Sequence, residues 1–369
     1  MKKQIAAFTL ATTLGLSIQP IVSSAETAQN MQATEQSGWV KDGNGTWFYF
    51  ENGVKKTGWL KDNDRWYYLD ANNGGSMKTG WVNVEGKYYY LDTDSDPNKI
   101  GVMKTGWLKD NDRWYYLDAN NGGSMKTGWV NVEGKYYYLD TDSDPNKIGV
   151  MKTGWLKDND RWYYLDANNG GSMKTGWVNV EGKYYYLDTD SDPNKIGVMK
   201  TGWIKDNDKW YYLDGSTDGS MKTGWFQEND QWYYLDANSG GAMVKGWNRT
   251  DGKMNYFKDN GQWINTRELT VTATAYTNDP AENGYKPGQH VYTKMGDDLT
   301  ANPNLKVIAV DPSVIPLGSK VYVEGYGIAE ARDTGGAIKG NKIDVFIPSK
   351  QESSNWGRQT VKIYVLPIN

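Results

Sequence analysis

The sequence predicts an all-β protein in which a repeat array of β-hairpins precedes a compact six-stranded β-domain. Two observations lead to this prediction. The pair Gly-Trp recurs ten times between Gly38 and Trp247, and a run rich in Trp and Tyr follows most of these pairs. After Trp263 the Gly-Trp pairs stop, and short β-branched segments follow. We therefore expect a solenoid of hairpins over residues 38–264 and a separate domain over residues 269–369.

Residues 1–25 have the pattern of an export signal peptide. Lys2 and Lys3 precede an apolar stretch, and Ser23-Ser24-Ala25 offers the small residues that a signal peptidase requires. An uncleaved membrane anchor is the alternative, but polar residues and Pro20 interrupt the stretch. We expect a secreted protein whose mature chain starts near Glu26 with a short linker over residues 26–37 and has no transmembrane segment.

The composition excludes several classes of protein. Cysteine is absent, which removes disulfides, thiolate metal sites and cysteine nucleophiles. The net charge of -4 arises from mixed charges, so the chain has no basic face for nucleic acid. Aromatic usage is unusual, with 18 Trp and 27 Tyr against 6 Phe. These rings combine a flat face with a polar edge, which suits sugars or cations at a wet surface.

The repeats alternate in length. The tryptophans of the Gly-Trp pairs are separated by 20, 22, 26, 22, 26, 22, 26, 22 and 22 residues. The block Gly58 to Thr105 recurs letter for letter as Gly106 to Thr153 and Gly154 to Thr201, which indicates duplication in units of 48 residues. Internal identity of this kind is typical of an array of stacked units.

Each unit predicts one hairpin. Gly58 to Lys61 is a short strand, an Asp-Asn-Asp turn follows, and Trp66 to Leu69 is a second strand rich in aromatic β-formers. A lone hairpin is marginal in water, and a unit has too few aliphatic residues for its own core. Adjacent units must therefore stack.

These units resemble the choline-binding or cell-wall-binding repeats of Gram-positive surface proteins, with GW, WYYLD and G-x-M-K-T in register. The resemblance implies that a Gly-Trp tryptophan, an aromatic seven residues on and an aromatic from the next unit form a cage for a quaternary ammonium group. The implied cage residues are Trp59, Trp66, Trp81, Trp107, Trp114, Trp129, Trp155, Trp162, Trp177, Trp203, Trp210, Trp225, Trp232 and Trp247.

Two alternatives to a full set of cages remain open. About half of these rings would serve mainly to pack hairpin on hairpin, as buried aromatics usually do. Alternate units also carry Tyr88, Tyr136 and Tyr184 in place of the second tryptophan, which would weaken every second cage. Related repeats in other secreted proteins bind glucans, and many bacterial walls lack choline. The resemblance therefore favours binding of a cell-wall polymer, which is teichoic acid, choline or glucan-like, over binding of choline itself.

The long loops begin Asp92-Thr-Asp94-Ser-Asp96-Pro. This start resembles a calcium loop, but Pro97 stands where an EF-hand needs Gly and Met103 where it needs Glu. We favour a solvated turn and expect no metal and no cofactor.

Six β-branched segments predict the C-terminal domain as a closed barrel. They span residues 270–276, 307–311, 320–324, 328–332, 342–347 and 360–366. Ser349 and Glu352 have the spacing of a capping box, which predicts one short helix ending near Trp356.

This domain resembles the three-aspartate (3D) domain of secreted stationary-phase muralytic proteins and of membrane-bound lytic transglycosylase A. The matching motifs are Ala309-Val310-Asp311-Pro312, Ile315-Pro316-Leu317-Gly318, Ala331-Arg332-Asp333-Thr334-Gly335-Gly336-Ala337-Ile338-Lys339-Gly340, Lys342-Ile343-Asp344-Val345 and Trp356-Gly357-Arg358. The resemblance implies a double-psi β-barrel.

The three aspartates are the candidate catalytic residues. Ile343 and Val345 share one face of their strand, so Asp344 must point to the other. Carboxylates brought together repel, which raises at least one pKa and favours a general acid. We expect Asp344 to be the acid and base, with Asp333 and Asp311 as tuning groups. Turn capping is the alternative role for each aspartate taken singly.

Weaker candidates for substrate contact are Tyr276, Thr334, Gly335 and Lys339.

The resulting hypothesis is a secreted, wall-associated enzyme that cleaves the glycan strands of peptidoglycan. A lytic transglycosylase is implied by the resemblance, a hydrolase is a variant of the same class, and a non-catalytic wall-binding protein is the alternative. His290 is the only histidine and no G-x-S-x-G motif exists, so serine-hydrolase and zinc-peptidase mechanisms are poor explanations.

Overall fold

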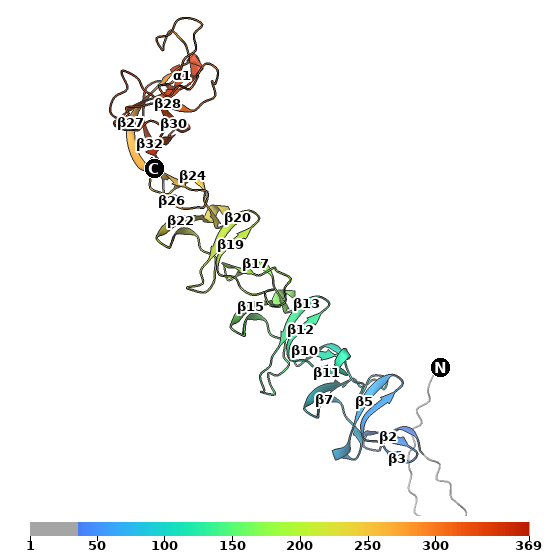
Figure 1. Ribbon diagram of the computed structural model, residues 1–369. Coiled ribbons are helices and arrows are strands. Elements are labelled where there is room, and N and C mark those ends of the chain that lie inside the picture. Colours follow the sequence, from blue (N-terminus) through green and yellow to red (C-terminus); the bar gives the residue numbers. More distant parts are fainter. Residues whose placement is uncertain (1–35, 369) are drawn as a thin grey trace, which may run out of the picture. The chain divides into compact units, whose positions relative to one another are not determined.

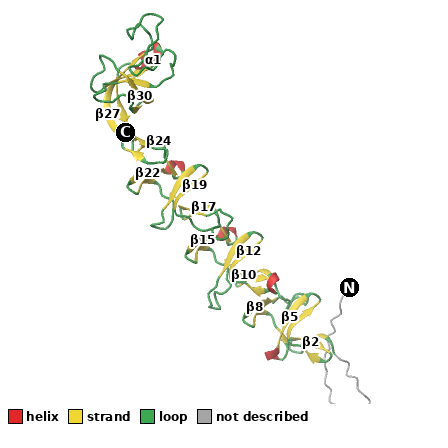
Figure 2. Ribbon diagram, viewed as in Figure 1, coloured by secondary structure: helices red, strands yellow, loops and turns green. Residues whose placement is uncertain are grey.

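The computed structural model describes residues 36–368, so the predicted signal peptide and most of the linker lie outside the described residues. The fold is all-β, as predicted, and helices are confined to short segments (Figure 2). The chain forms two compact units. The first unit comprises the described residues up to Gly176 together with Leu187–Val198. The second comprises Trp177–Tyr186 and the residues from Met199 onward. Across the described part of the chain, no helix has the length and apolarity needed to cross a membrane.

Ten hairpins build the repeat array (Figure 1). Their first strands are β1 (Gly38–Lys41), β4 (Gly58–Asp62), β7 (Gly80–Val84), β9 (Gly106–Asp110), β12 (Gly128–Val132), β14 (Gly154–Asp158), β17 (Gly176–Val180), β19 (Gly202–Asp206), β21 (Gly224–Glu228) and β24 (Gly246–Thr250). Their second strands are β2 (Trp47–Glu51), β5 (Arg65–Asp70), β8 (Lys87–Leu91), β10 (Arg113–Asp118), β13 (Lys135–Leu139), β15 (Arg161–Asp166), β18 (Lys183–Leu187), β20 (Lys209–Leu213), β22 (Gln231–Asp236) and β25 (Lys253–Phe257).

Short elements follow several of the hairpins. Two-residue third strands are β3 (Val54–Lys55), β6 (Ser76–Met77), β11 (Ser124–Met125), β16 (Ser172–Met173), β23 (Ala242–Met243) and β26 (Trp263–Ile264). Single 3-10 turns are η1 (Ala71–Asn73), η2 (Ala119–Asn121), η3 (Ala167–Asn169) and η4 (Ala237–Ser239). Asp70 caps η1 by accepting the amide of Asn72, so the Asp that ends the WYYLD run has a structural role.

Turn geometry sets the register of each hairpin. Asp62 pairs with Arg65, and the two residues between them, Asn63 and Asp64, have φ of 50° and 61°. Two central residues at positive φ define a type I′ turn, whose twist matches that of the flanking strands. The register then places Trp59 directly opposite Tyr68.

Strand alternation divides the aromatic run between two faces. In β5, Trp66 and Tyr68 point to one side and Tyr67 and Leu69 to the other. Leu69 is completely buried, as is the corresponding residue of most later hairpins. Tyr67 packs on Trp39 of the preceding hairpin with ring centroids 4.7 Å apart. The hairpins are therefore held to one another by aromatic contacts, as the sequence predicted.

The long loops form chains of aspartate turns. Asp92 accepts the amide of Asp94, Asp94 accepts that of Asp96, and Asp96 accepts that of Asn98, at 2.9–3.1 Å. Lys104 neutralises Asp92 at 2.7 Å. These side chains close turns on their own backbone, as Asx motifs do.

The C-terminal domain is a closed six-stranded barrel, as predicted, with strand order β27-β31-β28-β30-β29-β32. Its strands are β27 (Arg267–Tyr276), β28 (Val307–Ala309), β29 (Lys320–Val323), β30 (Gly327–Asp333), β31 (Lys342–Phe346) and β32 (Gln359–Val365). Two pairs are parallel, β27 with β31 and β28 with β30. Ser349 is the N-cap of the helix α1 (Lys350–Trp356), and its side chain accepts the amide of Glu352, as predicted.

The interior of the barrel is aliphatic. Ile343 and Val345 of β31 are fully buried there with residues from each of the other strands. A second, smaller cluster lies outside the barrel wall, where Phe346 and Val307 pack against Val291 and Leu299. Residues 277–306, which connect β27 to β28, supply this outer layer.

The last hairpin is joined closely to the barrel. Only two residues separate β26 from β27. Trp247 packs on Tyr322 with centroids 5.9 Å apart, and Arg249 pairs with Glu324 at 3.1 Å. The barrel thus covers an aromatic residue that would otherwise end the array, as a capping element does in repeat proteins.

A matched pair of glycines tests the loop geometry. A Cβ at Gly75 would lie 2.7 Å from the carbonyl oxygen of Lys56, whereas a Cβ at Gly74 would meet no atom within 4 Å, and both residues have positive φ. We expect Gly74→Ala to cost about 1 kcal/mol from backbone strain alone and Gly75→Ala to cost clearly more. Urea unfolding followed by tryptophan fluorescence measures both, and equal costs would contradict this packing.

Candidate functional site

Two of the three predicted aspartates lie on β31 and β30, the two strands that flank β28. Ala309 of β28 is the register partner of Asp344 on β31 and of Asp333 on β30. Directly paired residues point to the same side of a sheet, so both carboxylates flank Ala309 on the outer face. A register shift between Ile308 and Ala309 marks a bulge beside Asp333, and bulges commonly re-aim side chains at such positions.

Asp344 is the desolvated member of the set. Its neighbours Ile343 and Val345 point into the barrel, so its side chain faces outward, as predicted. The Oδ1 atom is buried and has no hydrogen-bond partner. Burial raises the pKa of Asp344 and the charge of Asp333 adds to the rise, while Thr274 and Lys342 act in the opposite direction. The carboxyl therefore holds its proton to higher pH than an exposed aspartate does.

Asp333 is held by backbone amides. Its Oδ1 accepts the amide of Lys294 at 2.9 Å and that of Thr334 at 2.8 Å. Lys294 belongs to the connection 277–306, so this segment reaches the site from outside the barrel. Two amide donors to one carboxylate oxygen orient the group.

Asp311 is engaged in a different way. Its Oδ1 accepts the amide and hydroxyl of Ser313, and its Oδ2 accepts the amide of Gly340 at 2.8 Å. The Gly340 amide and Ser313 lower the pKa of Asp311 to about 2. This carboxylate is partly exposed, ionised and tied to two loops, and it does not contribute to the raised pKa of Asp344.

Tyr276 lies beside the two carboxylates. It ends β27, opposite Phe346, and its buried hydroxyl has no hydrogen-bond partner. Burial raises the pKa of Tyr276, and the charges of Asp333 and Asp344 raise it further. The hydroxyl is thus a neutral donor close to both aspartates, and it is the weaker candidate that the structure brings to the site.

The remaining predicted contacts lie on the loop after β30. Thr334 donates its amide to Asp333, and the carbonyl of Gly335 accepts the amide of Ile338. Lys339 lies near Asp311, whose pKa its charge helps to lower. Within residues 36–368, no cluster of three or more His, Asp or Glu side chains has an arrangement that could hold a metal ion.

Pairs of tryptophans form right-angled corners along the array. The rings of Trp59 and Trp66 have centroids 6.4 Å apart and planes at 85°. Equivalent pairs, with centroids 6.3–6.5 Å apart, are Trp39–Trp47, Trp107–Trp114, Trp155–Trp162, Trp203–Trp210 and Trp225–Trp232. Trp66 is 41% exposed, as are Trp114, Trp162 and Trp232. A half-buried ring and an exposed one thus present two walls to solvent.

The next hairpin supplies a tyrosine to these corners. Tyr89 packs on Trp59 with centroids 4.7 Å apart, and Tyr137 packs on Trp107 at 4.8 Å. Trp81, the predicted third wall of the first cage, contacts Tyr90 and Tyr115. Trp59 therefore forms the corner with Trp66 and also packs on Tyr89 of the next hairpin, whereas Trp81 packs on tyrosines of its own and the following hairpin.

Junctions of a second kind alternate with the corners. Trp81, Trp129 and Trp177 have tyrosine at the position of the second tryptophan, and their indole nitrogens donate to Asp110, Asp158 and Asp206 at 3.1–3.2 Å. At the corner of Trp59 the equivalent residue of the next hairpin is Val84, which offers no acceptor. Within the duplicated block the two junctions are thus chemically distinct, whereas the corner tryptophans Trp39, Trp203 and Trp225 outside the block also donate to an acidic side chain.

Sequence reasoning missed several of these residues. Trp39 and Trp47 form a corner although eight residues separate them, because the β1–β2 turn is longer. Trp263 contacts Trp225 at 5.6 Å from beyond the last Gly-Trp pair. In the barrel, the contact of Lys294 with Asp333 had no sequence signal, because 39 residues separate the two.

Family models match both parts of the chain. A 3D domain is matched at residues 306–367. Choline-binding repeats are matched at residues 78–127, 126–177 and 200–247, and putative cell wall binding repeats at residues 37–53, 57–76 and 175–190.

Relatives with curated names share part of the chain. The cell wall-binding protein YocH of Bacillus subtilis is 67% identical over 102 residues, which is 27% of this chain and 33% of YocH. The putative cell wall shaping protein YabE of the same species is 58% identical over 98 residues, 27% of this chain and 23% of YabE. The matches thus span a third or less of these relatives.

Among solved structures, choline binding protein F of Streptococcus pneumoniae is 36% identical, with 59% of this chain and 75% of that chain covered and a TM-score of 0.46. The chain belongs to the cell wall-binding proteins built from choline-binding repeats, and it carries a 3D domain at its C-terminal end.

Proposed function

We propose that this protein is a secreted, wall-bound enzyme that cleaves the glycan strands of peptidoglycan as a lytic transglycosylase. The observation that carries the proposal is the carboxyl of Asp344, which is desolvated, lacks a hydrogen-bond partner at Oδ1 and lies on the same outer face as Asp333. A carboxyl that holds its proton to higher pH than an exposed aspartate suits general acid catalysis of glycoside cleavage.

One carboxyl suffices for the proposed reaction. Asp344 donates its proton to the glycosidic oxygen as the bond from that oxygen to the anomeric carbon of N-acetylmuramic acid breaks. The resulting carboxylate then accepts the proton of the same sugar's 6-hydroxyl as that oxygen attacks the anomeric carbon. The product is a 1,6-anhydro ring, and the carboxyl is regenerated without water being consumed.

The neighbouring groups have supporting roles in this proposal. Asp333, oriented by two amides, stabilises positive charge at the anomeric carbon in the transition state. Tyr276 offers its free hydroxyl to a substrate oxygen. Asp311 holds the loops of Ser313 and Gly340 together, which argues against a second proton-transfer carboxylate of the kind that a hydrolase needs.

We also propose that the tryptophan corners bind a wall polymer through a quaternary ammonium group or the face of a sugar. A desolvated cation over such rings gains about 2 kcal/mol. Six corners on one chain add avidity, so weak single sites would still hold the protein to a wall. The junctions that carry tyrosine in place of the second tryptophan serve packing instead.

Product analysis tests the enzyme proposal. The mature protein and its Asp344→Asn variant are incubated with purified peptidoglycan, and the released muropeptides are identified by mass spectrometry. We expect anhydromuropeptides from the wild type and at least a hundredfold less from the variant, because amide replaces the only proton donor.

Other products would decide between the alternatives. Reducing-end muropeptides would make the protein a hydrolase. Release by neither protein, with wall binding intact, would leave a non-catalytic wall-binding protein.

The raised pKa of Asp344 should also make the stability of the folded protein depend on pH. Because burial raises the pKa of Asp344, the folded state binds this proton more tightly than the unfolded state. The resulting stabilisation is complete below the ordinary aspartate pKa of about 3.9 and is lost as pH rises through the raised value. We expect Asp344→Asn to gain stability over the wild type between pH 4 and pH 7, measured as the difference in melting temperature. A difference that does not change with pH would contradict the raised pKa.

Two alanine variants test whether the tryptophan corners bind the wall: one substitutes the exposed tryptophans of the corners, and the other substitutes the tyrosines at the same strand position of the other junctions. Substitution of Trp66, Trp114, Trp162 and Trp232 should weaken wall binding at least about tenfold, since each removes the exposed wall of a corner. The control substitutes Tyr88, Tyr136 and Tyr184, which hold the same strand position at the other junctions. Pelleting with purified walls measures binding, and choline and a glucan serve as competitors. Equal losses in both variants would contradict the assignment.

A further inference from the structure

The connection 277–306 is anchored to the barrel rather than free. Val291 and Leu299 are 2% and 0% exposed, and they pack on Phe346 and Val307 of the barrel wall. Phe346 lies two residues from Asp344 on the same outer face of β31. The connection therefore covers the surface next to the proposed acid and helps to keep water from it.

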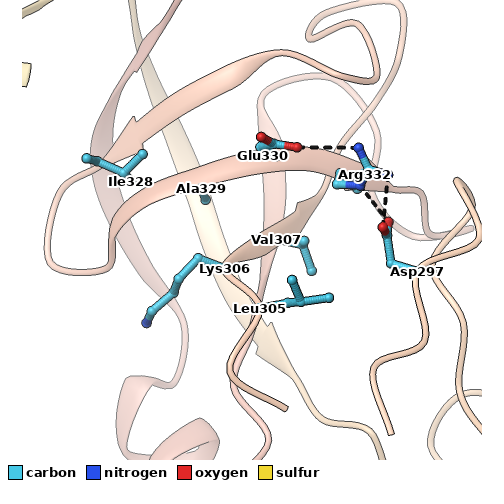
Figure 3. A pocket seen from close by; sticks show the side chains of 8 residues that line it. All are labelled: Asp297, Leu305, Lys306, Val307, Ile328, Ala329, Glu330 and Arg332. Atoms are coloured by element: carbon cyan, nitrogen blue, oxygen red, sulfur yellow. Dashed lines mark hydrogen bonds and ion pairs between the residues drawn. The ribbon is translucent and has the colours of Figure 1, made fainter. Parts of the chain in front are cut away.

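One ion pair fastens this connection to β30. Arg332 donates from Nε and Nη2 to the two carboxylate oxygens of Asp297, at 2.6 and 2.8 Å, and both side chains are about three-quarters buried. Figure 3 shows Arg332 between Asp297 and Glu330 at one end of a pocket that also contains Leu305 and Ile328. The bond to Glu330 is single and longer, at 3.3 Å. A bidentate pair fixes both distance and angle.

The same ion pair holds the turn that reaches Asp333. Asp297 accepts the hydroxyl of Thr293 at 2.7 Å and donates its own amide back to that oxygen at 3.0 Å. Within this turn, Met295 donates its amide to the carbonyl of Arg332, and Lys294 donates its amide to Oδ1 of Asp333. Two consecutive residues of β30, Arg332 and Asp333, thus hold the same short turn.

We propose that Asp297 and Arg332 are a positioning pair for the reaction, which locks the turn 293–297 over the outer face of the barrel so that Asp333 stays aimed and Asp344 stays dry. The catalytic part rests on the proposed function, because it takes Asp344 as the acid. The structural part does not, since the environment of Asp344 can be measured without turnover.

The direction of the effect follows from the groups around Asp344. Burial and the charge of Asp333 raise its pKa, and Thr274, its register partner on β27, and Lys342 on its own strand lower it. If the turn is released, water reaches the carboxyl and the constraint on Asp333 is lost. Both changes move the pKa of Asp344 down toward the ordinary value.

The experiment compares Asp297→Asn with Glu330→Gln in the full-length mature protein. The first variant removes the charge that fastens the turn, and the second removes the other partner of Arg332 without touching the turn. The carboxyl of Asp344 is titrated by carbon-13 NMR, assigned by its absence in Asp344→Asn, and the pH profile of muropeptide release is recorded in parallel. Arg332→Lys, which keeps the charge but lacks the planar fork, replaces Asp297→Asn if that variant does not fold.

We expect Asp297→Asn to lower the pKa of Asp344 and to move the alkaline limb of the pH profile to lower pH, while Glu330→Gln leaves both unchanged and Asp297→Glu restores them in part. An unchanged titration in folded Asp297→Asn would overturn the proposal, as would an equal shift in Glu330→Gln. If the wild type releases no muropeptides, the proposed function fails, and the titration alone still decides whether the pair positions Asp344.

Discussion

The edge-on contact between a Gly-Trp indole and a tyrosine of the following hairpin is the interaction on which the array depends. A two-stranded hairpin buries too little surface to fold alone, and eight of the ten hairpins here contribute a single fully buried leucine. Trp59 solves this problem by packing on Tyr68 of its own hairpin and on Tyr89 of the next. The indole belongs to two hairpins at once, so the stability of each depends on its neighbour.

Because of this constraint, the two tryptophans of one repeat have different surroundings. The Gly-Trp ring is half-buried because it holds two hairpins together, whereas the second tryptophan, such as Trp66, is free to stand out at a right angle to it. Where that residue is a tyrosine, as at Tyr88, there is no second tryptophan to form a corner, and the indole of Trp81 donates to Asp110. The barrel shows the same division, since Asp311 ties loops together while Asp344 stays free of partners at Oδ1.

The elements that depend on local patterns were predictable. Strand alternation in the WYYLD run, the six β-branched segments and the cap at Ser349 all follow from residues a few positions apart, and the structure confirms them. The outward direction of Asp344 followed from Ile343 and Val345 alone. Contacts between distant residues left no such signal: Tyr89 on Trp59, Trp247 on Tyr322 and Arg332 on Asp297 depend on how neighbouring elements pack. The hydrogen bonds of Asp311, Asp333 and Asp344 also differ because of contacts with distant residues, so the sequence did not predict these differences.

A crystal structure of the Asp344→Asn variant with a bound N-acetylglucosamine and N-acetylmuramic acid tetrasaccharide tests the account most directly, because the variant retains the shape of the site and lacks the acid. The account predicts that a glycosidic oxygen lies within hydrogen-bond distance of residue 344, on the outer face between β28 and β31, with Asp333 near the anomeric carbon of the same linkage. A glycan bound elsewhere on the barrel, with no glycosidic oxygen near residue 344, would contradict the assignment of Asp344 as the acid.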